Sequence, residues 1–325
     1  MTLLGALKRE IIGLGGDYAA WKARLSRRWR GLGDLRAGRM TPQRDEAVAV
    51  LRAAGLVLLA FAVLYLAGQF MPVGYDWNCC FSTRNLAPFF VPWTYPILDV
   101  INPSSLFELT LLGLALRVRQ YGGSAWVMGL AIVSLPTLWL LHLGNIDGLV
   151  IIGLLLMPVG VPLVLLKPQI AAFALLASHR RIAAAVAWGV ISLVIWGFWP
   201  ARFFGIGGEG WKADWPQDIT LFPWGILIAL PLLWLSRGDE DMLMAAGSFG
   251  TPHLFPYHFV LLMPALARMD KLWAFASWLL CWTPLLANYF GPLAWHFGNL
   301  FSGCVWLGLH IKRRGLRVKR EGTQT

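Results

Sequence analysis

The chain has 325 residues, of which 57% are hydrophobic and 14% are charged, against about 25% charged residues in ordinary soluble domains. The mean hydropathy is +0.59, and because a soluble domain could not bury that much apolar surface, we expect lipid to solvate part of it. The net charge of +11 does not indicate nucleic-acid binding, because no recognition motif accompanies it.

Basic residues are concentrated outside the apolar region. Eleven of the 28 lysines and arginines lie between Lys8 and Arg52, and six lie between Lys312 and Arg320. Basic flanks mark the cytoplasmic side of membrane helices and favour anionic lipid. The sequence therefore predicts three parts: a basic, amphipathic cytoplasmic segment (1–50), a polytopic transmembrane domain (51–311) and a basic cytoplasmic tail (312–325). The first part either lies as a helix on the inner membrane surface or is a solvated tail that fixes topology.

Apolar runs separated by polar breaks predict an all-α integral membrane protein, a bundle of about eight transmembrane helices. The expected crossings are 53–71, 104–119, 123–141, 148–166, 182–200, 219–236, 272–290 and 293–310. Ser104 or Ser105, just after Pro103, is expected to cap the second crossing.

Two further segments contain breaks and are predicted to be re-entrant or bent. Residues 162–178 are interrupted at Lys167 and Pro168, and residues 242–267 are interrupted at 250–253. With an even number of crossings, both termini lie in the cytoplasm. Only three basic residues then lie outside, against 25 inside: Arg84, Arg202 and Lys212. This topology predicts a multi-pass protein of a bacterial inner membrane.

Several polar side chains lie at or near membrane depth, where ionisable groups are costly and therefore candidates for function. They are Asp76, Asn145, Asp147, Lys167, His253, Tyr257 and His258. Structural roles remain open for some of them. Asp76 alone fits a solvated helix cap, Lys167 fits a side chain that extends to the inner headgroups, and the two histidines fit a satisfied polar break. The four cysteines have no metal-binding spacing, so no metal site is predicted.

Three blocks of sequence resemble one family. They are Tyr75-Asp76 with Trp93-Thr94-Tyr95-Pro96, then His142-Leu143-Gly144-Asn145-Ile146-Asp147 followed by Lys167-Pro168, and then Thr251-Pro252-His253 with Tyr257-His258. In order and spacing they resemble the polyprenol-phosphate-mannose-dependent mannosyltransferases of the GT-C glycosyltransferase superfamily. The family's Asn-Gly-Gln is Asn145-Ile146-Asp147 here, and the chain is shorter than typical members.

The resemblance implies transfer of a mannose-like sugar from a polyprenyl-phosphate donor to a lipid or glycan acceptor at the non-cytoplasmic face. Asp76 would be the catalytic base, and His258, with His253 behind it, would face the phosphate. Arg84 is a second phosphate candidate, Asn145 and Asp147 could hold sugar hydroxyls, and Lys167 matches the Lys-Pro block. Tyr257 belongs to the same binding group. No cofactor or divalent metal is required, although Asp76 with Asp147 could bind a metal ion, and the expected partners are membrane lipid, donor and acceptor.

Two alternatives remain open at this point. A transporter or lipid-flipping protein would gather its polar residues at the membrane midplane and contain an inverted repeat, which the sequence does not show convincingly. A non-catalytic scaffold or inactive relative would fit the altered motifs. An outward-facing site that joins Asp76, Asn145 and His258 would favour the transferase.

Overall fold

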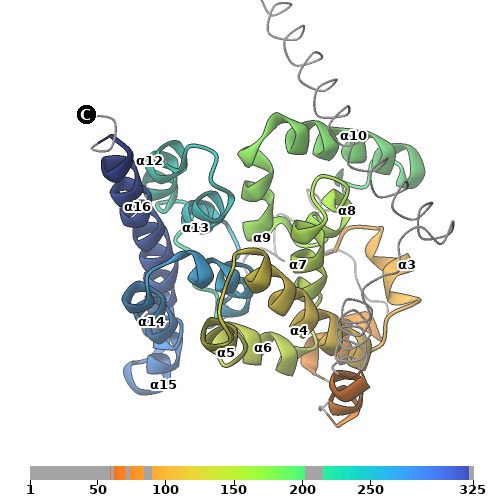
Figure 1. Ribbon diagram of the computed structural model, residues 1–325. Coiled ribbons are helices and arrows are strands. Elements are labelled where there is room, and N and C mark those ends of the chain that lie inside the picture. Colours follow the sequence, from red (N-terminus) through yellow and green to blue (C-terminus); the bar gives the residue numbers. More distant parts are fainter. Residues whose placement is uncertain (1–58, 60–61, 71–73, 84–89, 202–214, 322–325) are drawn as a thin grey trace, which may run out of the picture. The chain divides into compact units, whose positions relative to one another are not determined.

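The computed structural model describes residues 59, 62–70, 74–83, 90–201 and 215–321, with side chains up to residue 315. The regular elements in this part of the chain are all helical, which confirms the all-α class (Figure 1). The chain divides into two units, Met1–Val63 and Leu64–Thr325, and the elements described below belong to the second. The predicted segment 1–50 and most of the first predicted crossing lie outside the described residues.

Helices α4 (Pro103–Gln120) and α7 (Asp147–Leu155) pack against each other (Figure 1). Asn102, rather than either serine, caps α4, because its Oδ1 accepts a hydrogen bond from the Ser105 N–H at 2.8 Å. Proline 103 at the first helical position lacks the N–H that would otherwise need a partner.

The third predicted crossing is two helices, α5 (Ala125–Ile132) and α6 (Leu135–Leu143), bent by 51°. The bend follows from local chemistry. The Ser134 side chain caps α6, and Pro136 lies in its first turn, so a new helix begins where hydropathy alone predicts continuity. Helix α6 ends at Gly144, whose φ of +67° lies in the left-handed region that glycine adopts without strain.

Both segments that the sequence predicts to be broken are broken. The first consists of α8 (Val161–Val164), α9 (Pro168–Ala171) and the 3₁₀ helix η2 (Ala172–Ala177). The second consists of α13 (Glu240–Gly250) and the 3₁₀ helix η4 (Pro256–Arg268). Backbone without helical hydrogen bonds therefore separates α8 from α9 at Lys167, and α13 from η4 at 251–255, as the proline positions predict.

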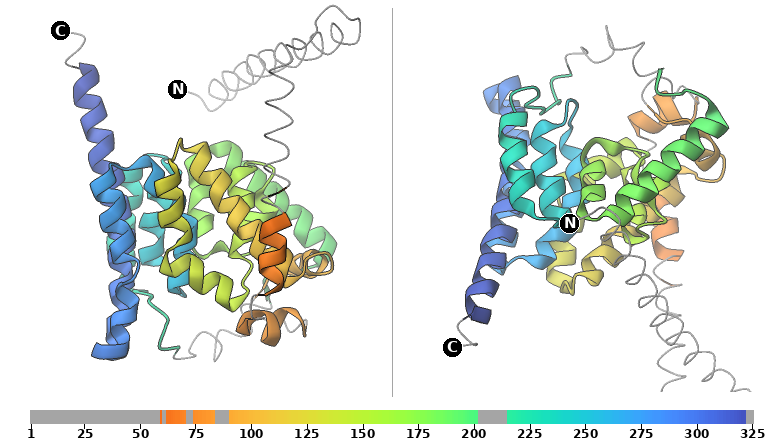
Figure 2. Two further views of the ribbon diagram at one scale, coloured as in Figure 1. Left: turned by 60° about the horizontal axis from the view of Figure 1, so that its bottom comes forward. Right: turned by 90° about the horizontal axis from the view of Figure 1, so that it is seen from above.

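The remaining elements complete the helical fold. They are the π-helix η1 (Trp77–Phe81), α3 (Thr94–Leu98), α10 (His179–Trp196), α12 (Ile226–Ser236), α14 (Lys271–Leu280), η5 (Thr283–Leu286), α15 (Ala287–Phe290), η6 (Pro292–Gly298) and α16 (Asn299–Glu321). Helix α16 packs against α13 and α14 and continues through the basic region after residue 311 (Figure 2). The predicted boundary between transmembrane domain and tail is therefore not a break in the helix.

The buried centre of this unit is built around η4 and α13. Residues 256–266 of η4 are all buried, as are residues 241–249 of α13. By length and apolar composition, one described helix, α10, could cross a bilayer, and the bent pair α5–α6 would be a second if it is one span. The other predicted crossings within the described residues are shorter, interrupted or, as in α4, too rich in charged residues, so the eight-helix topology stays a prediction.

Candidate functional site

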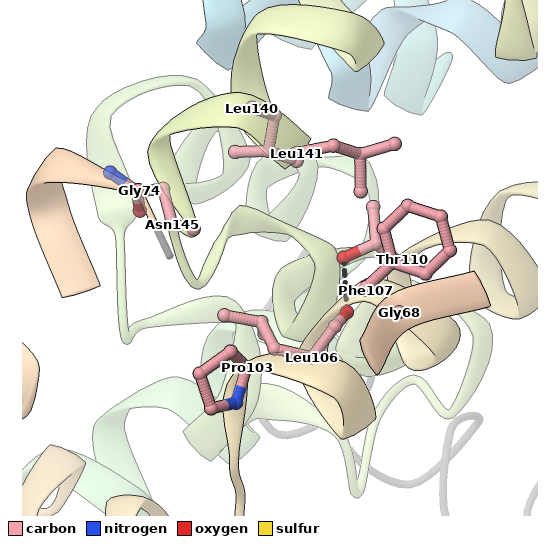
Figure 3. Close-up of a pocket in the computed structure, with 10 residues that line it drawn as sticks. Gly68, Gly74, Pro103, Leu106, Phe107, Thr110, Leu140, Leu141 and Asn145 are labelled. Atoms are coloured by element: carbon pink, nitrogen blue, oxygen red, sulfur yellow. Dashed lines mark hydrogen bonds between the residues drawn. The ribbon is translucent and has the colours of Figure 1, made fainter. Parts of the chain in front are cut away.

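The first polar loop is held against the end of α6 by a close backbone approach. A Cβ on Gly74 would lie 2.1 Å from the carbonyl oxygen of His142, so only glycine fits there. This approach brings Asp76, two residues later, to Asn145, whose Nδ2 donates a hydrogen bond to Asp76 Oδ2 at 2.5 Å. Figure 3 shows Gly74 beside Asn145.

Asp76 is half-buried, and its surroundings set its charge state. Burial raises the pKa of its carboxyl group above the ordinary value, while the ammonium of Lys167 and the hydrogen bond from Asn145 act in the opposite direction. An aspartate whose pKa is raised in this way, and which still accepts a positioned hydrogen bond, is suited to taking up a proton.

Asp147 is the centre of a second group of polar side chains. It opens α7 and is fully buried. Its Oδ1 lies 2.8 Å from Nδ1 of His258, and its Oδ2 lies 3.2 Å from Nζ of Lys167. Helix α7 reaches this position because Gly148 packs directly on Thr110 of α4, where a Cβ would lie 1.8 Å from Thr110 Oγ1.

Lys167 lies at the break before α9 and extends inward. Its side chain is 7% exposed, so it lies inside the protein rather than on its surface. The Nζ atom lies 3.4 Å from the hydroxyl of Tyr257 and over two rings, at 4.9 Å from the centroid of Tyr257 and 5.6 Å from that of Phe90. The broken backbone at Lys167 and Pro168 is what lets a lysine from this segment meet Asp147.

His258 presents a free ring nitrogen within this cluster. Its side chain is 2% exposed, and its Nδ1 is used by Asp147. Its Nε2 is buried and has no hydrogen-bond partner among the described residues. Since buried polar atoms are nearly always paired, this atom marks a place where a bound group could supply the missing contact.

The structure thus brings together six of the residues singled out from the sequence, here called the polar cluster. They are Asp76, Asn145, Asp147, Lys167, Tyr257 and His258. They come from three distant parts of the chain. In the structure the three sequence blocks meet, and Lys167 lies with the other members of the cluster.

His253 does not belong to the polar cluster. Its Nδ1 lies 2.7 Å from Asp218 Oδ2, and Phe255 lies between it and His258, with ring centroids 4.7 Å and 6.1 Å away. Asp218 also accepts hydrogen bonds from the N–H groups of Thr220 and Leu254. Burial acts to raise the pKa of Asp218, but the hydrogen bonds from His253 and the backbone outweigh it and the pKa is lowered.

Arg84, the other phosphate candidate, lies outside the described residues. Asp218 was missed by sequence analysis, because a single aspartate at the end of a polar loop gives no signal of a partner 35 residues away. A small pocket opens beside the cluster between α4 and α6 (Figure 3). Asn145 and Gly74 line it together with Thr110, whose hydroxyl donates to the Leu106 carbonyl.

A second charged group, here called the ionic network, was also missed. Arg117, at the end of α4, and Arg181, in the first turn of α10, both pair with Glu240 at the start of α13. Arg268, at the end of η4, pairs with Asp239 and Asp241 at 2.5 Å. Tyr121 joins the two halves, with its hydroxyl 2.7 Å from Glu240 Oε1 and 3.0 Å from Asp241 Oδ1.

Neither group resembles a metal site. No cluster of three or more histidine, cysteine, aspartate or glutamate side chains that could hold a metal ion occurs among the described residues. No protein-family model matches the chain, and neither curated proteins nor solved structures give a match.

Proposed function

We propose that this protein is a multi-pass membrane glycosyltransferase of the GT-C type. It would move a mannose-like sugar from a polyprenyl-phosphate donor to a lipid or glycan acceptor at the non-cytoplasmic face. The observation that carries the proposal is the polar cluster, in which a carboxylate suited to proton uptake lies close to a buried ammonium and imidazole. Such a transfer needs a base for the acceptor and positive donors for the departing phosphate.

In this proposal each side chain has one task. Asp76 takes the proton from the acceptor hydroxyl, and the oxygen of that hydroxyl forms the new bond to C1 of the sugar. The bond between C1 and the phosphate oxygen breaks, and its electron pair leaves on the polyprenyl phosphate. Lys167 and His258 stabilise that negative charge, while Asn145 holds Asp76 and a sugar hydroxyl in place.

Membrane insertion is supported by large apolar side chains on the surface. Val194 of α10 is 80% exposed, Phe290 is 72% exposed, and Leu293 is 81% exposed. Soluble proteins rarely expose contiguous apolar surface, whereas lipid solvates it without cost. Helix α10 is the clearest case, since only 6% of its 18 residues are buried inside the protein.

The test is sugar transfer by purified protein in detergent from a short-chain prenyl phosphomannose, radiolabelled in the prenyl group, to a set of lipid and glycan acceptors. Release of labelled prenyl phosphate reports transfer whichever acceptor takes the sugar. Asp76→Asn removes the base with little change in shape, so we expect at least a hundredfold loss of turnover, within the range general-base catalysis supplies, about 10² to 10⁴. Asp218→Asn is the matched control, because that aspartate is also half-buried and hydrogen-bonded to a side-chain nitrogen but lies outside the cluster.

Full turnover by Asp76→Asn would exclude Asp76 as the base. Absence of turnover in the native protein with every acceptor supplied, alongside movement of labelled lipid across vesicles, would favour the second candidate, transport. The complete burial of Asp147 favours that alternative, because a closed polar site at membrane depth is also what a carrier needs.

A further inference from the structure

In the polar cluster, the contact with Asp147 determines whether Nδ1 of the His258 imidazole carries a hydrogen. An ionised carboxylate can only accept hydrogen bonds, so Nδ1 of His258, 2.8 Å from Asp147 Oδ1, carries a hydrogen. In a neutral imidazole the other nitrogen then bears a lone pair. That atom, Nε2, is the buried one without a partner among the described residues.

The charges of the cluster balance in this state. Asp147 contributes one negative charge and Lys167 one positive charge, and they lie 3.2 Å apart with side chains 0% and 7% exposed. With neutral His258, the three side chains Asp147, Lys167 and His258 together carry no net charge. Asp76, which interacts with Asn145, adds a negative charge to the polar cluster when it is ionised. Burying an uncompensated charge costs several kcal/mol, so neutrality is the stable condition of such a centre.

An anion bound in this centre would disturb both features at once. It would add a negative charge to a neutral buried site, and its oxygen would face the lone pair of Nε2 if it approached His258. One proton on Nε2 removes both problems, because the imidazolium donates to the anion through Nε2 and to Asp147 through Nδ1. Asp147 then lies between two cations, Lys167 and His258, and these three side chains and the anion together carry no net charge.

We propose that the polar cluster binds its phosphodiester ligand together with one proton, which is taken up by His258. This deepens the proposed function and rests on it, since it assigns a proton-coupled mode of binding to the same site. The charged and titratable groups that act on His258 are Asp147 of α7, Lys167 before α9, and His253 and Tyr257 of its own segment. His253 is paired with Asp218, so His258 is the imidazole of this segment that lies in the cluster and has a buried ring nitrogen without a partner among the described residues.

The probe is citronellyl methyl phosphate, a prenyl phosphodiester with one permanent negative charge, so any proton exchanged belongs to the protein. Isothermal titration of the full chain in detergent, in buffers of different ionisation heat, gives the number of protons taken up per molecule bound. Citronellol, which lacks the charge, corrects for partition into micelles. We expect about one proton per phosphodiester, and affinity falling about tenfold per pH unit where free His258 is neutral.

The variant His258→Gln keeps a hydrogen-bond donor but cannot be protonated, so it should bind the probe with no proton uptake. His253→Gln is the matched control, since His253 is also paired with an aspartate, and it should keep the uptake of one proton. If His258→Gln fails to fold, the same titration of Asp76→Asn decides the question. Uptake that persists there excludes the other titratable group at the edge of the cluster, whereas loss of uptake would place the proton on Asp76 and overturn the inference.

Binding of the probe by the native protein without proton uptake would overturn this inference and leave the proposed function standing. Uptake that persists in His258→Gln, or disappears in His253→Gln, would overturn it too, because the proton would then lie elsewhere. Absence of probe binding altogether would overturn the proposed function, and the inference with it.

Discussion

Asp76 combines two opposing influences on one carboxyl group. Burial raises its pKa, and the hydrogen bond from Asn145 and the charge of Lys167 partly offset that rise by favouring the ionised form. A base acts only when ionised, so activity that depends on Asp76 should increase with pH through a pKa above that of an ordinary aspartate.

The hydrogen bond from Asn145 gives a prediction with a definite sign. In Asn145→Ala the ionised form of Asp76 loses a donor at 2.5 Å, so its pKa should rise further. The acid limb of the turnover profile should therefore move to higher pH, which a pH series of turnover under saturating donor measures. An unmoved limb would mean that another group controls it. His253→Gln, which leaves the surroundings of Asp76 intact, should not move it.

Glu240 is the residue on which the ionic network depends. It pairs with both Arg117 and Arg181, and the side chain of Arg117 is 4% exposed, so loss of the carboxylate leaves a buried guanidinium without its counter-charge. We expect Glu240→Gln to lower the free energy of unfolding by about 3 kcal/mol.

Denaturant unfolding in mixed micelles measures this change. The control is Asp270→Asn, which breaks the contact with Lys312 at 3.7 Å between exposed side chains and should change stability little. Equal effects of the two substitutions would show that burial of the network contributes nothing.

At the scale of elements, glycines decide how closely two helices approach. Gly148 of α7 lies so close to Thr110 of α4 that an added Cβ would be 1.8 Å from its hydroxyl oxygen and 2.9 Å from its Cα. Because backbone as well as side chain is in the way, rotation of Thr110 cannot make room. Helices α4 and α7 would have to separate, and α7 carries Asp147.

We therefore expect Gly148→Ala to destabilise the protein by about 1–3 kcal/mol, the usual cost of overpacking, and to reduce turnover as Asp147 moves. Gly129→Ala on α5 is the control, since nothing lies within 4 Å of its added Cβ and alanine favours a helix by up to about 1 kcal/mol. Thermal melting of both variants in one detergent makes the comparison. A stable Gly148→Ala protein would show that the α4–α7 contact can relax.

Breaks in helices could be predicted from the sequence where a proline causes them. Pro168 and Pro252 predicted the two broken segments, because proline cannot continue a helix. The bend between α5 and α6 was not predicted, since Ser134 and Pro136 are also compatible with a turn inside one apolar run. The 13-residue 3₁₀ helix η4 gave no signal either, as its apolar residues equally suit an α-helix.

At the scale of the whole molecule, the sequence predicted which segments meet but not how. The Asp76, Asn145 and His258 blocks converge as expected, whereas the contact of Lys167 with Asp147 was not predicted, because a structural role for that lysine was left open. The predicted topology places the helix ends that carry Arg117, Arg181 and Glu240 on the cytoplasmic side. These three side chains form ion pairs in the ionic network. Pairings of that kind depend on tertiary packing, which periodicity along the chain cannot report.

The proposed membrane insertion gives a prediction for the molecule as a whole. If lipid covers the exposed apolar side chains of helices such as α10, the protein should stay in the pellet after alkaline carbonate washing of membranes. Fluorescent-protein fusions at either terminus should fluoresce in a bacterial host and alkaline-phosphatase fusions should be inactive, since both ends are predicted to be cytoplasmic. Release by carbonate, or a phosphatase-active terminus, would contradict the topology.

The close backbone approaches around the site also affect how relatives of this chain could be recognised. An acid can be replaced by another polar group when a substrate changes, but the space beside the His142 carbonyl and beside Thr110 admits no side chain at all. The spaced pattern Gly74-Tyr75-Asp76 followed by Gly144-Asn145-Ile146-Asp147-Gly148 is therefore a more durable signature than the acids alone. Proteins that keep this spacing should share the architecture of the site even where their chemistry has diverged.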